Sequence, residues 1–277
     1  MKKRFKKVYI EITNICNLHC RFCPPTRRTK EFMSSSNFSE VISKVNGYTN
    51  LVYLHLRGEP LIHPELKEIL DVCSENNIMV NLTTNATLIN DKKDIINNHS
   101  SLRQINYSLH SLEENDITDI KQYMDSIMMF IETNKNIIHS LRFWNLQNGV
   151  TKNTLVISYL KDKFGINDSD LQKPSLKIRE NLYLNQEHEF SWPDVNNDIN
   201  LPNGFCYGLR DQIGILVNGD VVPCCLDANG EMVLGNIFTS NLDSIISSSR
   251  ATSILNGFSN RHALEDLCIH CEYKQRF

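Results

Sequence analysis

Apolar residues follow two different spacings along the first two thirds of the chain. Short apolar runs suited to buried strands occur at residues 8–13, 51–56, 78–83, 105–110, 140–146 and 176–179. Between these runs the apolar residues recur every three or four positions, which predicts helices at residues 37–45, 64–70, 117–134 and 154–164. Strands that alternate with helices predict a parallel sheet covered by helices, with about six βα units.

The carboxyl ends of the predicted strands supply a first set of candidate site positions. In parallel sheets of this kind, chemistry collects where the strands end. Those ends fall at residues 16–23, 58–60, 84–85, 108–111, 144–145 and 179–180.

Three cysteines, Cys16, Cys20 and Cys23, stand in a CxxxCxxC spacing directly after the first predicted strand. Three thiolates on one loop can hold three corners of a cubane iron–sulfur cluster and leave its fourth iron without a protein ligand. The alternatives are a zinc site, which normally needs a fourth ligand, or a disulfide with one cysteine spare. We predict an open iron–sulfur site, where the unligated iron is available for chemistry.

This loop resembles the cluster-binding signature of radical S-adenosylmethionine (SAM) enzymes. The resemblance implies a 4Fe-4S cluster whose fourth iron is chelated by the amino and carboxylate groups of SAM. It implies cleavage of SAM to a 5′-deoxyadenosyl radical, which removes a hydrogen atom from the substrate. It also implies a partial (β/α)6 barrel and cofactor-binding positions at Phe22, Gly58, Glu59, Asn85 and Ser108.

Two of these positions match the family pattern best. Gly58-Glu59-Pro60 resembles the motif whose backbone and acidic residue meet the amino group of SAM, and a carboxylate suits that ammonium end. Ser108 resembles the polar position that meets the carboxylate or ribose of SAM. Arg57 and Ala86 stand where the family often has glycine, and the second departure weakens the match at the neighbouring Asn85. The alternative for Glu59 is a surface acid near a helix start.

A second cysteine set lies near the end of the chain and comprises Cys206, Cys224, Cys268 and Cys271. Asn218-Gly219-Asp220 between two apolar runs predicts a β-hairpin just before Cys224. Four cysteines from a hairpin and a distant CxxC can enclose a cluster completely, although a structural zinc site suits the same set. The adjacent Cys225 competes with Cys224 as a ligand, whereas Cys73 is expected to be an apolar residue buried in a helix.

This segment resembles the twitch domain, the shortened form of the SPASM extension of radical SAM enzymes. The resemblance implies one auxiliary 4Fe-4S cluster held by those four cysteines, since the further cysteines of a full SPASM domain are missing. The predicted fold is α/β, a partial (β/α)6 radical SAM barrel followed by a small cysteine-rich β-hairpin plus helix domain. We expect the barrel at residues 1–182, a loop or lid at 183–205 and the twitch domain at 206–277.

Composition narrows the choice of partner. The 277 residues carry a net charge of −3 with scattered basic residues, so the basic face typical of nucleic-acid binding is not expected. No apolar run approaches a membrane span, and the N-terminus lacks the apolar core of a signal peptide. Nine cysteines without a secretion signal indicate metal binding in the reducing cytoplasm. A small-molecule substrate and a one-electron donor such as flavodoxin or ferredoxin are expected.

Substrate contacts are expected near the strand ends and in the aromatic loop around Phe190 and Trp192. That loop is either a packed lid or a substrate contact, and Trp144 either packs in the core or stacks on a substrate. The general acid or base is not identified. The candidate substrate-binding residues are Arg142, Trp144, Asn145, Arg179 and Asp194.

Three short runs, at residues 141–146, 190–193 and 206–210, resemble a gut-bacterial group linked to queuine lyases. Such lyases split queuine to 7-aminomethyl-7-deazaguanine, a queuosine precursor. The alternatives are a dehydrogenase of a cyclic amino alcohol and a peptide-modifying enzyme. A peptide-modifying enzyme usually has a separate leader-binding domain, which is not expected here because the first strand begins within the first ten residues. A protein that only relays electrons would have no use for an open iron beside a carboxylate.

Overall fold

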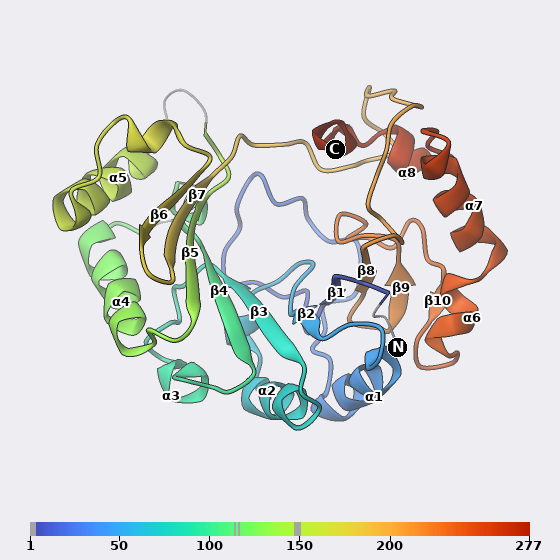
Figure 1. The fold of residues 1–277 in the computed structure, drawn as a ribbon, viewed down its shortest axis with the longest axis horizontal. Helices are drawn as coiled ribbons and strands as arrows, with labels where there is room; N and C mark the ends of the chain where they lie inside the picture. The colour runs from blue at the N-terminus through green and yellow to red at the C-terminus, as the bar shows by residue number, and fades with distance from the viewer. Residues whose placement is uncertain (1–3, 114, 116, 147–150) are drawn as a thin grey trace.

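The computed structural model describes residues 4–113, 115, 117–146 and 151–277. Its framework is a ten-stranded sheet in the order β10-β9-β8-β1-β2-β3-β4-β5-β7-β6. Six neighbouring parallel strands form the barrel part of this sheet and curve around an interior that the loop after β1 crosses (Figure 1). They are β1 (Lys7–Ile10), β2 (Leu51–Tyr53), β3 (Met79–Thr84), β4 (Leu102–Ser108), β5 (Ile138–Phe143) and β7 (Leu182–Gln186). The predicted partial barrel is confirmed.

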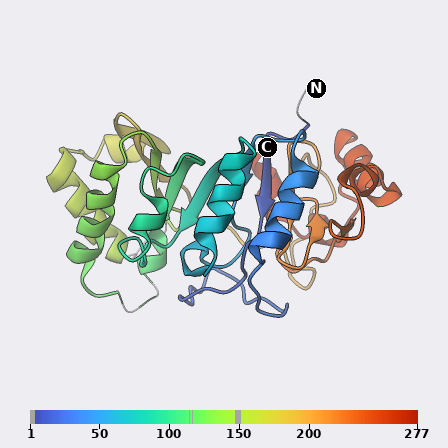
Figure 2. The ribbon, with the colours of Figure 1, turned by 90° about the horizontal axis from the view of Figure 1, so that it is seen from below.

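Helices cover the outer, convex side of this sheet (Figures 1 and 2). They are α1 (Ser35–Val45), α2 (Leu66–Glu75), α3 (Lys93–Ile96), α4 (Ile120–Thr133) and α5 (Thr151–Phe164). Helix α1 begins where the Ser34 side chain accepts a hydrogen bond from the backbone N–H of Asn37, and it buries Phe38, Val41, Ile42 and Val45. These residues stand at positions i, i+3, i+4 and i+7, so their side chains lie on the one helix face that meets the sheet.

The inner, concave face of the sheet is polar. Along β4, Gln104, Asn106 and Ser108 alternate with Ile105 and Tyr107, which are fully buried. The same alternation continues across the sheet, because Asn106 is opposite Ser140 and Ser108 is opposite Arg142 in β5. A parallel sheet buried on both faces would be apolar throughout. The alternation therefore gives the barrel an interior suited to polar ligands.

One predicted strand is placed wrongly. Residues 176–179 were expected to be the sixth parallel strand, but β6 (Ser175–Arg179) is antiparallel to β7. The cause is the tight turn at Glu180 and Asn181, where Asn181 has a φ of 56°. A two-residue turn reverses the chain, whereas a parallel partner needs a long crossover. Strand β7 takes the sixth place, and the domain boundary expected after residue 182 falls inside it.

The C-terminal segment continues the same sheet. Strand β8 (Gln212–Ile215) pairs in parallel with β1, and β9 (Asp220–Val222) and β10 (Gly235–Asn236) follow in antiparallel order. The predicted hairpin at Asn218-Gly219 is confirmed, with Gly219 at a φ of +87° where other residues are strained. Three short helices complete this side of the molecule in Figure 1, α6 (Leu242–Ile246), α7 (Ser249–Ser259) and α8 (Asp266–Ile269).

Four 3-10 helices connect these elements, η1 (Pro60–Ile62), η2 (Leu109–Leu112), η3 (Asp170–Gln172) and η4 (Glu272–Arg276). Two of them shape the site, η2 directly after β4 and η1 directly after Glu59. No helix in the described ranges is long and apolar enough to cross a membrane.

Candidate active site and iron–sulfur centres

The first three cysteines lie on the loop that follows β1. Each of their sulfurs has an N–H donor within hydrogen-bonding distance. The backbone N–H of Leu18 lies 3.4 Å from Cys16 Sγ, and Asn115 Nδ2 lies 3.3 Å from Cys20 Sγ. Arg57 Nη1 lies 2.9 Å from Cys23 Sγ. Such donors stabilise the negative charge of thiolates that ligate a cluster, so these residues fit an iron–sulfur centre.

Arg57, which stands where the family often has glycine, has a specific place in this loop. Its side chain is 5% exposed, and Nη2 donates a hydrogen bond to the carbonyl of Pro24. Its Cζ also lies 5.0 Å from the ring centroid of Trp192. Arg57 therefore joins the end of β2 to both the cysteine loop and the aromatic loop at residues 190–193. This role of Arg57 was not predicted from the sequence, where its only sign is an arginine directly before Gly58.

Gly58 brings the next residue against the backbone that precedes the cysteine loop. Its φ is +76°, and a Cβ atom would lie 2.3 Å from the carbonyl oxygen of Thr13. The backbone N–H of Glu59 then donates to the carbonyl of Ile15 at 2.8 Å. Only glycine accepts both this conformation and this close approach.

The Glu59 carboxylate is 2% exposed, so the alternative of a surface acid is wrong. It accepts hydrogen bonds from the backbone N–H groups of Leu61 at 2.9 Å and Asn85 at 2.7 Å, and from Thr84 Oγ1 at 2.7 Å. Burial raises the pKa of Glu59 to about 7, although these three donors oppose the rise. A cationic group bound nearby would favour the charged carboxylate.

Asn85 connects the end of β3 to the first cysteine. Its Nδ2 donates to Asn17 Oδ1 at 2.9 Å and lies 3.8 Å from Cys16 Sγ. The following residue, Ala86, has a φ of +62°. Alanine thus holds the left-handed conformation that glycine would adopt without strain, so the backbone here keeps its course despite the substitution.

An aromatic column leads from the cysteine loop into the barrel. The ring centroid of Phe22 is 4.9 Å from that of His110, and His110 lies nearly parallel to Trp144 at 6.5 Å. Ser108, at the end of β4, and Arg142, on β5, lie opposite each other beside this column. Because Trp144 is 36% exposed and lines a cavity, the expectation that it packs in the core is wrong.

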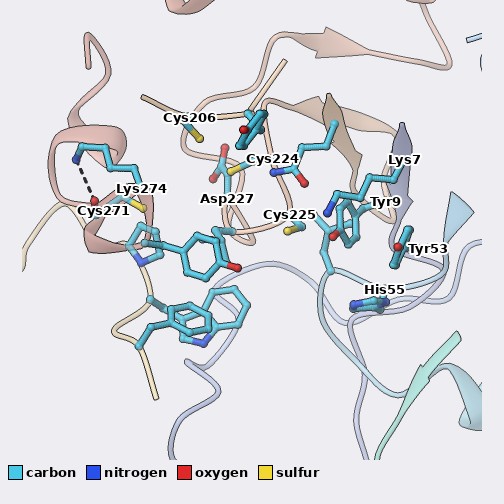
Figure 3. A pocket seen from close by; sticks show the side chains of 18 of the residues that line it. Lys7, Tyr9, Tyr53, His55, Cys206, Cys224, Cys225, Asp227, Cys271 and Lys274 are labelled. Atoms are coloured by element: carbon cyan, nitrogen blue, oxygen red, sulfur yellow. Dashed lines mark hydrogen bonds between the residues drawn. The ribbon is translucent and has the colours of Figure 1, made fainter. Parts of the chain in front are cut away.

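This cavity has a volume of about 690 Å³ and extends between the two cysteine sets. Figure 3 shows one side of it, with Tyr9, Tyr53 and His55 from the barrel facing cysteines of the C-terminal segment. Phe22 and Ser108, from the candidate SAM-binding set, also line it, as do Arg142 and Trp144 from the candidate substrate-binding set.

The other three candidate substrate residues lie outside this lining. Asn145 is buried, and its Oδ1 accepts a hydrogen bond from Asn153 at 2.8 Å. Arg179 pairs with Glu132 of α4 at 2.6 Å, because the antiparallel direction of β6 carries it to the opposite end of the sheet. Asp194 lies 3.5 Å from Arg27 and lines a smaller neighbouring pocket of about 150 Å³. Arg179 and Asp194 therefore fit structural ion pairs better than substrate contacts.

The second cysteine set comes from three segments that meet beside the cavity. Cys206 precedes β8, Cys224 follows β9, and Cys268 and Cys271 lie in and after α8. In Figure 3, the side chains of Cys206, Cys224 and Cys271 face a common space. Burial raises the pKa of each of the four thiols, and the thiols also raise the pKa of Cys224 and Cys268 through mutual repulsion.

A buried cation offsets negative charge in this second set. Lys274 is 3% exposed, and its Nζ donates to the carbonyls of Cys268 at 2.6 Å and Cys271 at 2.9 Å. In the described ranges, no three His, Cys, Asp or Glu side chains are grouped closely enough for one shared metal ion.

Among the described residues, Cys225 has a partner that Cys224 lacks. It lies beside Tyr9 in Figure 3 and is hydrogen-bonded to the phenol of that residue. This hydrogen bond favours Cys224 over Cys225 as the ligand. Cys73 is fully buried in α2, as expected.

Comparisons with known proteins agree with these two centres. A model of the radical SAM superfamily matches residues 10–156, and a model of the SPASM iron–sulfur cluster-binding domain matches residues 206–272. An uncharacterized protein of Methanocaldococcus jannaschii is 30% identical over 266 residues, which cover 85% of this chain and 90% of the relative.

Two solved structures share the fold. BtrN, in complex with AdoMet and 2-DOIA, is 17% identical with a TM-score of 0.57, over 98% of this chain and 94% of BtrN. The anSMEcpe protein, with bound AdoMet and a Kp18Cys peptide, is 13% identical with a TM-score of 0.64, over 89% of this chain and 82% of the other. The family implies a 4Fe-4S cluster with SAM at the first cysteine set, and the SPASM match selects iron–sulfur over zinc at the second. The chain is therefore a radical SAM enzyme with a C-terminal twitch-type auxiliary cluster domain.

Proposed function

We propose that this enzyme acts on a small polar molecule held in the cavity between the two cysteine sets. The observation that carries the proposal is the cavity itself, whose volume of about 690 Å³ lies in the range of small-molecule sites. It is lined by Phe22 beside the first cysteine set and by Cys224 and Cys271 of the second. A substrate placed there would lie between the two centres.

The assigned roles follow from these positions. Cys16, Cys20 and Cys23 hold the catalytic cluster, and Phe22, Gly58, Glu59, Asn85 and Ser108 position SAM. When bound, the cluster and SAM supply a 5′-deoxyadenosyl radical that removes a hydrogen atom from the substrate. The contribution of the chain is to orient the reactants and exclude water. The buried Glu59 and the column of Phe22, His110 and Trp144 serve these purposes.

Cys206, Cys224, Cys268 and Cys271 hold one auxiliary 4Fe-4S cluster in this proposal, with Lys274 as the cation that balances its charge. A one-electron donor such as flavodoxin or ferredoxin would reduce the enzyme. Thiolate-held clusters persist in reducing compartments, so we place the enzyme in the cytoplasm.

Two reactions are the specific candidates. Queuine lyase is the first, since the faces of Trp144, Tyr9 and Tyr53 suit stacking on a flat deazaguanine ring. Dehydrogenation of a cyclic amino alcohol is the second, since auxiliary-cluster ligands line the same cavity and the cluster could accept the second electron of an oxidation.

The proposal is tested with enzyme reconstituted anaerobically with iron and sulfide. It would be incubated with SAM and a reductant, with and without queuine and a panel of cyclic amino alcohols, while mass spectrometry follows 5′-deoxyadenosine and products. A compound that raises 5′-deoxyadenosine and yields a coupled product supports the small-molecule class, and the product mass separates lyase from dehydrogenase. Coupled turnover seen only with peptides would overturn it and establish a peptide-modifying enzyme.

A further inference from the structure

Four cationic side chains line the large cavity, and two of them lack an acidic partner. Lys6 pairs with Asp211 at 2.6 Å, and Lys274 donates to two backbone carbonyls. In the part of the chain that the structure describes, Arg142 and Lys7 have no carboxylate within ion-pairing distance. These two cations therefore require a different explanation.

Arg142 projects from β5 into the cavity. Its Nε donates a hydrogen bond to Ser140 Oγ at 3.3 Å, and its Cζ lies 5.0 Å from the ring centroid of Trp144. Burial lowers the pKa of Arg142 to about 10, so the guanidinium stays charged at neutral pH. Removing a charge from water without an ionic partner is unfavourable. A ligand that brings a negative charge would remove this cost.

Lys7 projects from β1 toward the same region. Its Nζ lies 5.5 Å from the ring centroid of Tyr9 and 5.8 Å from that of Tyr53. The acids of the lining are engaged elsewhere. Asp211 pairs with Lys6, Glu189 lies 3.8 Å from Arg21, and Asp227 accepts hydrogen bonds from two backbone N–H groups.

His55, at the end of β2, connects these two cations. The charges of Arg142 and Lys7 both act electrostatically on this imidazole. The centroid of its ring lies 5.6 Å from that of Tyr9 and 6.1 Å from that of Tyr53. Its Nδ1 is buried without a hydrogen-bond partner among the described residues. A buried polar atom of this kind is usually satisfied by a ligand or water. The ring of His55 is therefore available to contact a bound group. It lies beside the rings of Tyr9 and Tyr53, whose centroids are 4.8 Å apart.

We propose that Arg142, Lys7 and His55 form a subsite that binds an anionic oxygen group of the substrate, a carboxylate or a phosphate. Guanidinium and ammonium groups are the side chains that bind these anions, and the flanking rings favour a substrate with a flat face next to the anion. The inference rests on the proposed function, because it assumes that this cavity holds the substrate. An amine, such as that of queuine or of an amino alcohol, would have to lie away from these two cations.

The test uses matched pairs of ligands that differ only in charge. Isothermal titration of the anaerobically reconstituted enzyme, with SAM present, would compare benzoate with benzamide, and phenyl phosphate would represent the second source of anionic oxygen. We expect benzoate or phenyl phosphate to bind at least about tenfold more tightly than benzamide. The R142Q and K7Q variants should each lose most of this preference, and R142K should retain part of it. The K6Q variant is the matched control, because Lys6 is already paired with Asp211 and its side chain is 76% exposed.

Formation of 5′-deoxyadenosine without substrate, measured on the same samples, separates this inference from the proposed function. An enzyme that cleaves SAM but binds benzoate, phenyl phosphate and benzamide equally would overturn the subsite and leave the proposed function standing. Equal loss of the preference in K6Q and K7Q would also overturn it, since the effect would then be one of general charge. Failure of the wild-type enzyme to cleave SAM would count against the proposed function itself. Anion binding seen only with acidic peptides would assign the subsite to a peptide ligand and reject a small molecule.

Discussion

The two cysteine sets differ in how the protein surrounds them. In the first set, Cys16 and Cys23 are exposed, and N–H groups from several elements reach the sulfurs. In the second set all four cysteines are only partly exposed, and the buried Lys274 binds the carbonyls of two of them. The first arrangement leaves space for a ligand on the metal side of the loop. The second arrangement encloses its centre with protein groups.

This difference is consistent with two different tasks. A centre that takes part in chemistry needs an open coordination position and access for its co-substrate, whereas a centre that stores or relays charge benefits from burial and fixed neighbours. The cavity reaches Phe22 on the first cysteine loop and all four cysteines of the second set, so the polar inner face of the barrel lies between the two centres.

The largest expected effect comes from breaking the open centre. We expect Cys20→Ala to abolish SAM cleavage while the fold and the auxiliary cluster remain, because a loop with two thiolates cannot hold three corners of a cubane. The measurement is 5′-deoxyadenosine by mass spectrometry, together with iron content and circular dichroism. Persistent 5′-deoxyadenosine would contradict the assignment. Cys73→Ala is the control for loss of a cysteine in general.

The next effect concerns the closed centre, where two adjacent cysteines give a matched pair. We expect Cys224→Ala to lose about half of the bound iron and the spectroscopic signal of one cluster, whereas Cys225→Ala retains both. The reason is that the Cys225 thiol is hydrogen-bonded to the phenol of Tyr9. Mössbauer spectroscopy and iron determination check this. The opposite result, with Cys225 needed and Cys224 dispensable, would exchange their roles.

A smaller effect at the open centre is expected from Glu59. Burial raises the pKa of this residue to about 7. Protonation of this carboxylate removes the negative charge offered to the amino group of SAM. We therefore expect SAM affinity to rise as the pH increases through about 7 and then level off, and E59Q to bind roughly tenfold more weakly with a flatter profile. Equilibrium binding across this pH range measures both.

The control for that pH profile is E65Q, which removes a nearby carboxylate that hydrogen-bonds to the backbone of Ser35 instead. It should keep the wild-type profile. If E59Q and the wild-type enzyme show the same pH dependence, the titration belongs to SAM or to another group.

The smallest effect is on stability. Ala86 holds a φ of +62°, a conformation that costs alanine about 1 kcal/mol more than glycine. We expect Ala86→Gly to raise resistance to thermal unfolding slightly without changing the cysteine loop, because the backbone already follows the course that glycine prefers. Scanning calorimetry of the reconstituted protein measures this. A decrease in thermal stability would show that the methyl group, which is buried, contributes more by packing than it costs in strain.

Sequence reasoning succeeded where the signal was local. The cysteine spacing, the Gly58-Glu59 segment at a strand end and the hairpin at Asn218-Gly219 all depend on a few consecutive residues. It failed at residues 176–179, because an apolar run does not state the direction of its strand. The turn at Asn181 set that direction, and it also moved Arg179 away from the expected site.

The order of strands and helices, the two cysteine patterns and the polar alternation along β4 are properties of the sequence, since each arises from periodicity or spacing along one segment. Only the tertiary structure decided that Arg57 reaches Cys23 and that Lys7 of β1, Arg142 of β5 and His55, after β2, come together. Contacts between residues far apart in sequence depend on strand register and on the curvature of the sheet. Neither is encoded in any short stretch of the chain, so these contacts become visible only when the sheet is assembled.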